Sequence, residues 1–405
     1  MAILESAALF CRKPQVNLLL IVWRDVRLGD DEHIEVSRDL LIITPSGLEH
    51  GGGIGRVIGY FLDAWKSQPA APRYTVIDSR GIGHVAVSPL FLAISLVKIA
   101  THWRRRPIAH IHVAGRASTL RKLIVVAWCR LLRMHVVLHL HDYNYRRYFF
   151  DQPAWLRRLI RAMFQAARRV LVLGHSDAEL MESALGVASD RVVVLHNAVP
   201  RPVTPASHDG APLRILFLGR LSERKGVHDL IAAFADPRLV GLPWCATLAG
   251  DGDVEHFREL ARSSGVLERI TFTGWLDRPS TDRLLADAHI LVLPSYEEGM
   301  AMSVLEGLAY GLCVVCTPVG ALAEVIEDGR SGLLCKPGDV AGLATALARA
   351  VSDPDLRRRL RAGALERHHE GFDIDHYARR LIAVFRDLDS SNPQASRAAE
   401  PVRRA

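Results

Sequence analysis

Residues 38–65 read RDLLIITPSGLEHGGGIGRVIGYFLDAW, which is an apolar run, a glycine-rich turn and a helical pattern in succession. The run at 38–44 shows no alternation with polar residues, which is typical of a strand buried on both faces. Further apolar runs occur at helix-length intervals, namely RYTVIDS, IAHIHVAG, MHVVLHLHD, RRVLVLG and DRVVVLHN. Strands that alternate with helices predict a parallel sheet covered on both faces.

A proline-rich stretch at 200–212, PRPVTPASHDGAP, separates this series from a second one. The second series consists of LRILFLG, CATLAG, RITFTG, AHILVLP, LCVVCTP and SGLLC. We therefore expect two α/β domains, both Rossmann-like and doubly wound, joined by a hinge. Ligands of such sheets bind at the carboxyl ends of the strands, so the two domains should face each other across an interdomain cleft.

The domain boundaries come from these patterns. Residues 1–37 show no clear relation to the rest of the chain and form an extension of unknown role. We expect an N-terminal domain at 38–200, a linker at 201–212, a C-terminal domain at 213–372, a helix returning to the N-terminal domain at 373–390, and a disordered tail at 391–405.

The composition excludes several classes of protein. Of the 405 residues, 49% are hydrophobic and 23% are charged, which rules out a fibrous or wholly disordered chain. The six cysteines are scattered and form no disulfide framework, so we expect a reducing compartment. Cys313 and Cys316 lie in an apolar run that predicts a buried strand rather than a metal or redox site. We expect no signal peptide, and the apolar stretch at 85–100 is too short to span a bilayer.

A glycine-rich turn, GGGIGR, occupies residues 51–56 between a predicted strand and a predicted helix. Glycines there permit a tight turn, and the helix N-terminus offers free N–H groups to an anion. We expect Gly52 and Gly53 to face a ligand; a merely structural turn is the alternative. Asp78 lies at the distance of a dinucleotide-binding fingerprint, but Arg56 and Ile58 stand where that fingerprint requires glycine.

Two further motifs carry charged residues at strand ends. The first, LFLGRLSERKG, places Gly219, Arg220 and Lys225 before a helix, where two cations suit a diphosphate. A solvated basic loop is the alternative. The second, PSYEEGMAMSVLEGLAYG at 294–311, carries Ser295, Gly299 and the carboxylates of Glu298 and Glu306. We expect its helix to begin near Gly299, with Glu306 accepting hydrogen bonds from sugar hydroxyls; a capping Glu298 and a solvated Glu306 are the alternatives.

Taken in order, these motifs resemble those of the retaining glycosyltransferases of family 4, which have the GT-B fold. The resemblance covers residues 38–388 and is strongest in ILFLGRLSERKG, in LAGDGD and in LADAHILVLPSYEEGMAMSVLEGLAYGLCVVCTPVG. It implies transfer of a sugar, as by a hexosyltransferase, from a nucleotide-diphosphate sugar with retention of anomeric configuration.

The resemblance also implies roles for single residues. Arg220 and Lys225 would hold the donor diphosphate without an essential metal or other cofactor, and Glu298 would lie near the transferred sugar. Glu306 would bind the ribose, and the amides of Gly299, Met300 and Ala301 would line the sugar and phosphate. Here Met300 and Ala301 replace the larger or aromatic residue common after the Glu-Gly pair, and Ala198 stands where the family often has glycine.

The strand VVLHLHD resembles the one that carries the family's active-site histidine, which would be His141, in contact with the donor sugar. His139 shares a strand face with it. His110 and His112 repeat the same spacing on another strand. No carboxylate or cysteine cluster completes a metal site there, so we expect no metal.

The positive charge is concentrated in one stretch. Residues 85–170 hold 16 Lys and Arg but two acidic residues, a local charge of +14, while the rest of the chain carries −7. This stretch lies in the domain that receives the acceptor in the family. It suits an anionic membrane and a lipid-linked or oligosaccharide acceptor, with a solvated arginine-rich surface as the alternative; no nucleic-acid motif accompanies it.

We therefore expect a cytoplasmic glycosyltransferase of polysaccharide, exopolysaccharide or glycolipid biosynthesis, bound peripherally to the inner face of the cytoplasmic membrane. A nucleotide-sugar epimerase with the same fold, a non-catalytic sugar-nucleotide-binding subunit and a nicotinamide-dependent oxidoreductase remain alternatives.

Overall fold

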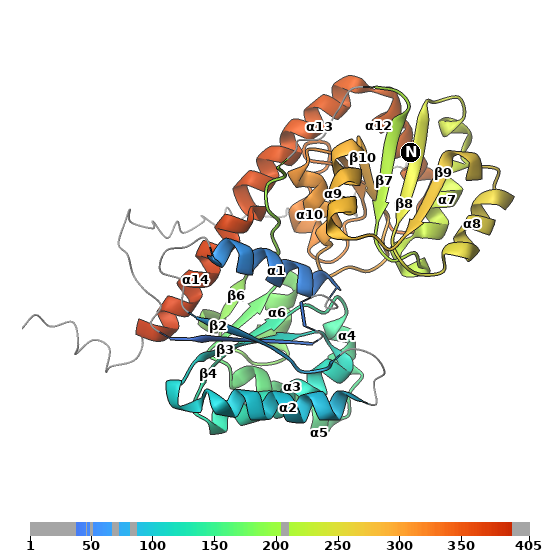
Figure 1. Ribbon diagram of the computed structural model, residues 1–405. Coiled ribbons are helices and arrows are strands. Elements are labelled where there is room, and N and C mark those ends of the chain that lie inside the picture. The colour runs from blue at the N-terminus through green and yellow to red at the C-terminus, as the bar shows by residue number, and fades with distance from the viewer. Residues whose placement is uncertain are drawn as a thin grey trace, which may run out of the picture. The chain divides into compact units, whose positions relative to one another are not determined.

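The computed structural model of the chain describes residues 38–45, 47–48, 52–66, 73–81, 87–203 and 210–390. The predicted extension at 1–37, the predicted tail at 391–405 and much of the predicted linker lie outside the described residues. The described elements form two six-stranded sheets with flanking helices, and every strand pair is parallel (Figure 1). All twelve strands expected from the apolar runs are confirmed.

The first sheet has the strand order β2-β1-β3-β4-β5-β6. Its strands are β1 (Leu40–Thr44), β2 (Tyr74–Asp78), β3 (Ile108–Val113), β4 (His135–Leu140), β5 (Arg169–Val172) and β6 (Val192–Val194). The helices of this part are α1 (Gly52–Lys66), α2 (Ser88–Thr101), α3 (Arg116–Leu131), α4 (Tyr145–Phe150), α5 (Ala154–Gln165) and α6 (His175–Ser183), with short 3-10 turns at Trp103–Arg105 and Ser189–Arg191. Helices α2, α3 and α5 cover one face of the sheet, and α1 covers the other (Figure 1).

The second sheet has the strand order β12-β11-β10-β7-β8-β9. Its strands are β7 (Leu213–Leu218), β8 (Trp244–Ala249), β9 (Ile270–Gly274), β10 (Ile290–Leu293), β11 (Cys313–Cys316) and β12 (Leu333–Leu334). Its helices are α7 (Val227–Phe234), α8 (Val254–Ser263), α9 (Arg278–Asp287), α10 (Met302–Ala309), α11 (Leu322–Val325), α12 (Val340–Ser352) and α13 (Pro354–Arg367), with 3-10 turns at Glu223–Lys225, Pro237–Leu239 and Leu267–Arg269.

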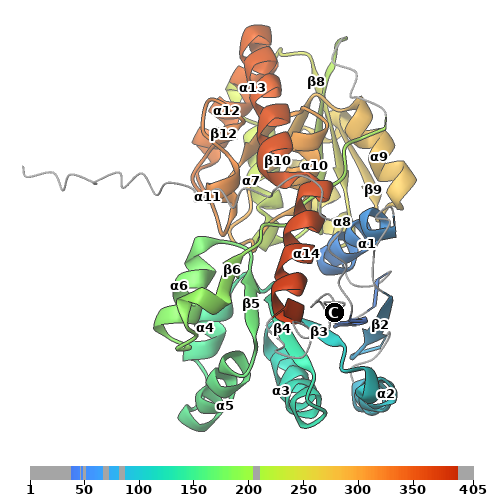
Figure 2. The same ribbon diagram turned by 90° about the vertical axis from the view of Figure 1, so that its left-hand side faces the viewer.

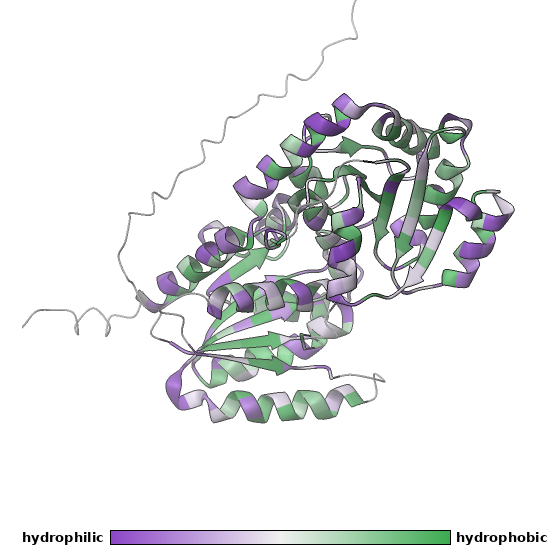
Figure 3. Ribbon diagram, turned by 45° about the horizontal axis from the view of Figure 1, so that its top comes forward, coloured by the Kyte–Doolittle hydropathy of each residue, from purple (hydrophilic) through white to green (hydrophobic). Residues whose placement is uncertain are grey.

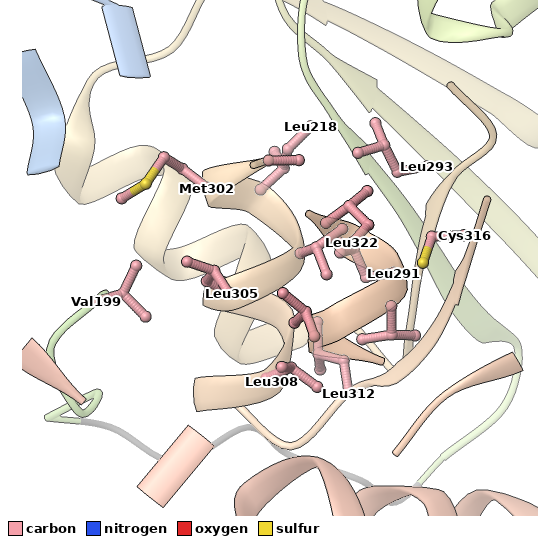
Figure 4. Close-up of a cluster of buried hydrophobic side chains, with 14 of the residues drawn as sticks. Val199, Leu218, Leu291, Leu293, Met302, Leu305, Leu308, Leu312, Cys316 and Leu322 are labelled. Carbon is pink, nitrogen blue, oxygen red and sulfur yellow. The ribbon is translucent and has the colours of Figure 1, made fainter. Parts of the chain in front are cut away.

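Helix α10 is buried along its whole length. Figure 4 shows Leu305 and Leu308 of α10 in one cluster with Leu291 of β10 and Leu312. Burying one such leucine stabilises the fold by about 1.5–3 kcal/mol. The helix that carries Glu306 is therefore held rigidly by the core of the second sheet.

The last described segment of the chain packs against the first sheet. A π-helical turn at His368–Phe372 leads into α14 (Ile374–Ser390), which lies beside α1 (Figure 2). The ring of Phe385 packs 6.4 Å from that of Trp65, and Asp389 accepts a hydrogen bond of 2.8 Å from Arg38. A segment that comes after the second sheet in sequence thus completes the core of the first.

The start of α10 differs from the sequence-based expectation. The helix begins at Met302 rather than near Gly299, and Glu306 consequently lies about one turn into it. The preceding carbonyls are already engaged, because Ser295 accepts from Thr317, Glu297 from Arg224, and Gly299 from the Ala321 amide. These hydrogen bonds from distant partners hold residues 295–299 in a non-helical path, and Ala301 has an extended backbone just before the helix.

Cys313 and Cys316 confirm the expected buried strand. Both thiols lie in β11 and are fully buried, and burial raises the pKa of the Cys313 thiol to about 12. None of the described cysteines forms a disulfide.

Candidate functional site

A largely buried charged contact in the second domain joins the two predicted loops. The Lys225 ammonium donates to Glu298 Oε1 over 2.5 Å, and the Ser295 hydroxyl donates to the same oxygen over 2.7 Å. Both charged side chains are largely buried, at 12% and 8% exposure. Because α10 is capped by Ala301 without a side-chain bond, a capping role for Glu298 is wrong.

Two glycines allow the loops that carry Lys225 and Glu298 to approach each other. Gly226 has φ of +68°, and a Cβ there would lie 2.0 Å from the carbonyl oxygen of Pro294. Gly320 has φ of +57°, and its Cβ would lie 1.9 Å from the carbonyl oxygen of Glu298. Any L-residue would be both strained and in steric conflict at these positions, so the two glycines fix Lys225 and Glu298 against each other.

Glu306 faces the first domain. Its carboxylate, 6% exposed, accepts from the Arg56 guanidinium over 3.0 Å and from the Tyr60 hydroxyl over 3.0 Å. Burial, and secondly the Glu306 carboxylate, raises the pKa of the Tyr60 phenol. A solvated Glu306 is therefore wrong as an interpretation.

Arg56 and Tyr60 lie one turn apart on α1, and no role was predicted for them from the sequence. Arg278 of α9 adds a third cation, with its guanidinium carbon 4.3 Å from the centre of the Tyr60 ring. A signal for Arg56 was available, since it interrupts the glycine motif at the start of a helix.

Arg220 and Arg224, in the same loop, make different contacts. Arg220 is 68% exposed and lies 3.7 Å from Asp251, so its guanidinium is accessible to a ligand. Arg224, for which no role was predicted, donates to the Glu297 carbonyl over 2.5 Å and stacks over Tyr143 at 4.7 Å. Tyr143 belongs to the first domain, so this contact also spans the two sheets.

His141 comes directly after β4. Its Nε2 lies 2.8 Å from Nδ1 of His112, and burial lowers its pKa to about 3, so the ring is neutral at physiological pH. A Cβ on Gly299 would lie 3.5 Å from the His141 carbonyl oxygen. The structure thus places the Glu298–Gly299 loop against His141.

A cavity of about 740 Å³ opens between the two sets of loops. It contains seven of the predicted residues: Gly53, Gly219, Arg220, Lys225, Glu298, Met300 and Ala301. Tyr60 and Arg278 line both this cavity and a neighbouring one of about 1220 Å³, whose wall includes Glu306. Gly52 begins α1 beside Gly53, whose Cβ would lie 3.7 Å from Met302. Ser295, Gly299 and His141 are not among the described residues that line the cavity.

The charge of the 740 Å³ cavity is positive. Among the described residues that line it, five are cationic (Arg56, Arg220, Arg224, Lys225 and Arg278) and three are acidic (Asp63, Asp251 and Glu298). Its mouth carries Trp275, which is 72% exposed. An excess of cations beside an exposed indole suits a ligand with phosphate groups and an aromatic ring.

Potential metal ligands gather elsewhere. Within the described ranges, a group of three residues able to hold a metal consists of His110, His112 and His139, all buried in the first sheet. This group lies beneath His141 and outside the residues that line the cavity.

Comparison with known proteins identifies the two halves separately. Residues 57–201 match the family described as glycosyltransferase family 4, and residues 212–353 match the glycosyl transferases group 1. Together these matches span more than half of the chain. The chain belongs to the family 4 glycosyltransferases. Its two sheets with flanking helices are the GT-B fold.

Relatives of this family 4 glycosyltransferase align with part of its sequence. The lipopolysaccharide core biosynthesis glycosyltransferase LpsE of Rhizobium meliloti is 36% identical over 230 residues, which are 56% of this chain and 62% of LpsE. A glycogen synthase of Mycobacterium tuberculosis is 37% identical over 175 residues, 43% of this chain and 42% of the synthase. The chain thus matches about two fifths of the synthase's length.

Solved structures share the fold over most of the chain. The sucrose-phosphate synthase of Thermosynechococcus elongatus superposes with a TM-score of 0.70 at 19% identity, covering 88% of this chain and all of that one. HepE of Anabaena, solved with UDP and glucose, gives 0.68 at 17% identity, covering 87% of this chain and all of HepE.

Proposed function

We propose that the positive cavity binds a nucleotide-diphosphate sugar and that the enzyme transfers the sugar, with retention of configuration, to a lipid-linked or glycan acceptor. The observation that carries this proposal is the excess of five cations over three carboxylates in a cavity lined by loops of both domains. The relatives support it, because HepE was solved with UDP and glucose, and LpsE is named for lipopolysaccharide core biosynthesis. We place the product in polysaccharide or glycolipid biosynthesis.

In this proposal Arg220 and Lys225 bind the diphosphate, and Arg224 assists them. As the glycosidic bond breaks, negative charge grows on the leaving phosphate, and fixed cations in a partly buried site stabilise it. Lys225 is suited to this role because Glu298 and its loop hold the ammonium in place over 2.5 Å. The chemistry then requires no metal at the diphosphate.

Glu306 accepts hydrogen bonds from the ribose hydroxyls. A carboxylate can accept about four such bonds, and Arg56 and Tyr60 account for three of them. Glu298, together with the amides of Gly299, Met300 and Ala301, binds the transferred sugar, and the neutral His141 beside the Glu298–Gly299 loop contacts it as well. Trp275 offers a stacking surface to the base.

We propose front-face substitution for the transfer step. The bond between the anomeric carbon and the phosphate oxygen breaks, while the acceptor hydroxyl oxygen bonds to that carbon from the same face. Its proton passes to the leaving phosphate oxygen. Trapping a covalent sugar on the enzyme would contradict this route, and an inverted anomeric signal in the product NMR spectrum would contradict retention.

The test begins with the donor. UDP-, GDP- and ADP-sugars are screened for thermal stabilisation of the protein, and the stabilising donor is then assayed for release of the nucleoside diphosphate and of a sugar product. We expect stabilisation by one donor class, and its loss in Glu306→Gln. The matched control is Glu255→Gln, because Glu255 is exposed on α8 and pairs with Arg258 on the surface. Stabilisation by no nucleotide sugar would overturn the proposal.

The same assay separates the alternatives. An epimerase would change the nucleotide sugar without releasing the diphosphate, and a binding subunit would be stabilised without turnover. A nicotinamide-dependent oxidoreductase would respond to the dinucleotide instead of the sugar.

A membrane role rests on the exposed surface of α2, α3, α5 and the turns that follow α2 and α3, which we call the basic apolar face. It presents apolar side chains beside cations: Leu90, Val97, Trp103, Leu131, Trp155 and Leu159, with Arg104, Arg105, Arg106, Arg130, Arg133 and Arg158. Figure 3 shows α2 as mainly hydrophobic, and its one charged residue is Lys98. We propose that this face rests on the anionic inner leaflet of the cytoplasmic membrane. No helix in the described part of the chain is long and apolar enough to span a bilayer.

A further inference from the structure

Four histidines line one face of the first sheet. The register pairs His112 of β3 with His139 of β4, and residues two apart on a strand share a face. The HxH of β3 and the HxH that ends β4 are therefore brought side by side. The ring centres of neighbouring histidines lie 4.0–5.5 Å apart.

Three of these rings are buried without hydrogen-bond partners for most of their nitrogens. His110, His112 and His139 are at most 1% exposed. Within the described residues, both ring nitrogens of His110 and His139, and Nε2 of His112, have no partner. Each buried unsatisfied polar atom costs about 1–3 kcal/mol, so five of them at one place require a compensating interaction.

The rings are enclosed by neighbouring side chains. Phe385 of α14 packs on His110, with the ring centres 5.6 Å apart, and closes the cluster from that side. A neutral imidazole carries one free lone pair, which is the form that binds a metal ion.

We propose that His110, His112 and His139 bind a borderline divalent transition-metal ion such as Zn²⁺. One ring nitrogen from each lies within 4.8 Å of the others. Tetrahedral Zn²⁺ with bonds of about 2.0–2.1 Å needs nitrogens about 3.4 Å apart, so the rings must close by about 1.4 Å at most. Imidazole nitrogens without carboxylates favour zinc, nickel or copper over magnesium or calcium.

His141 fits this site as a supporting group. It is bonded to Nδ1 of His112, which leaves the unpartnered Nε2 of His112 as the metal ligand. Histidine ligands of metals usually have their second nitrogen held in this way, because the hydrogen bond fixes the tautomer and the ring orientation. The metal would thereby also fix the orientation of His141 beside the cavity.

The experiment uses the full-length chain with any purification tag removed. The protein is stripped with a chelator, dialysed against Zn²⁺, and assayed for metal content by mass spectrometry; Co²⁺ then serves as a probe with a visible absorption spectrum. We expect about one Zn²⁺ per chain, a higher melting temperature with Zn²⁺, and a tetrahedral Co²⁺ spectrum.

The variants separate a metal site from simple packing. His110→Leu and His139→Leu should lose the bound metal and the Co²⁺ spectrum, yet fold without metal, since leucine leaves no unsatisfied nitrogen. The control His102→Ala removes a partly exposed histidine at the end of α2 and should retain the metal. A wild-type chain that retains no Zn²⁺ and shows no shift in melting temperature would overturn the proposal, whatever the variants do.

Discussion

At the scale of single residues, the charged pairs between loops carry the candidate chemistry. Lys225 and Glu298 are both largely buried, and each is the nearest counter-charge of the other. Removing one partner of such a pair leaves an uncompensated charge, so structural and catalytic effects of a single substitution overlap.

For Lys225→Met we expect turnover to fall by on the order of 10²–10³, because the leaving diphosphate loses a fixed cation. Stability should also fall, since Glu298 stays buried without its ammonium partner. The double variant Lys225→Met/Glu298→Gln should regain stability in urea unfolding but not turnover. Lys66→Met is the control, as Lys66 forms a surface pair with Asp63. Full activity in Lys225→Met would contradict the assignment.

Glu324 links the two domains and should make stability depend on pH. Burial alone would raise its pKa, but hydrogen bonds from His196 and His175 outweigh burial and lower the pKa to about 2. A carboxyl with a lowered pKa in the folded state stabilises the protein above its unfolded pKa of about 4.3. That contribution is lost as pH falls from about 4.3 to about 2.

We expect Glu324→Gln to lower the free energy of unfolding by about 1–2 kcal/mol at pH 7, a figure reduced for the partial exposure of the side chain. The difference from wild type should shrink as the pH of urea unfolding is lowered below about 4.5. Glu255→Gln, on the exposed face of α8, should show no such trend. A difference that stays constant with pH would show that the carboxylate charge is not involved.

At the scale of elements, α14 connects the end of the chain to the first sheet. Its apolar face packs on α1 through Phe385 and Tyr377, and its polar face carries Arg380, which donates to the Val194 carbonyl over 2.8 Å. The first sheet therefore depends on a helix that comes after the second in sequence.

Phe385→Ala should cost about 3–5 kcal/mol in the free energy of unfolding, because it removes a fully buried ring between Trp65 and His110. Arg379→Ala, at an exposed position of the same helix, should change it by less than about 0.5 kcal/mol. Urea unfolding of both variants measures the difference. Equal stabilities would mean that α14 is not docked on α1 in solution.

The strands were predictable from apolar runs, whereas the start of α10 was not. Nothing in the local sequence at 295–301 shows that its carbonyls accept hydrogen bonds from Arg224, Thr317 and Ala321. These donors are distant along the chain, so a local pattern cannot anticipate them.

At the scale of the whole molecule, charge is divided unevenly. The stretch 85–170 carries +14 and the remainder −7, and the described cations of that stretch border the apolar side chains of the basic apolar face. Attraction to an anionic bilayer weakens with salt, while insertion of apolar side chains does not.

We expect the protein to bind vesicles containing anionic lipid at about 50 mM salt and to dissociate largely at about 500 mM salt. Trp103→Ser and Trp155→Ser should each weaken binding in co-sedimentation. Trp275→Ser is the matched control, as Trp275 is also exposed but lies on the second domain. Binding that is indifferent to salt and to lipid charge would leave a solvated arginine-rich surface as the better interpretation.

The sequence by itself determined the two parallel sheets, the buried strand at Cys313–Cys316 and the order of charged motifs, because these depend on residues close together in the chain. The tertiary structure alone decided which polar side chains meet: Arg56 and Tyr60 with Glu306, and the two HxH motifs across one strand register. Such contacts depend on which elements pack together, and packing distances are not encoded in local periodicity.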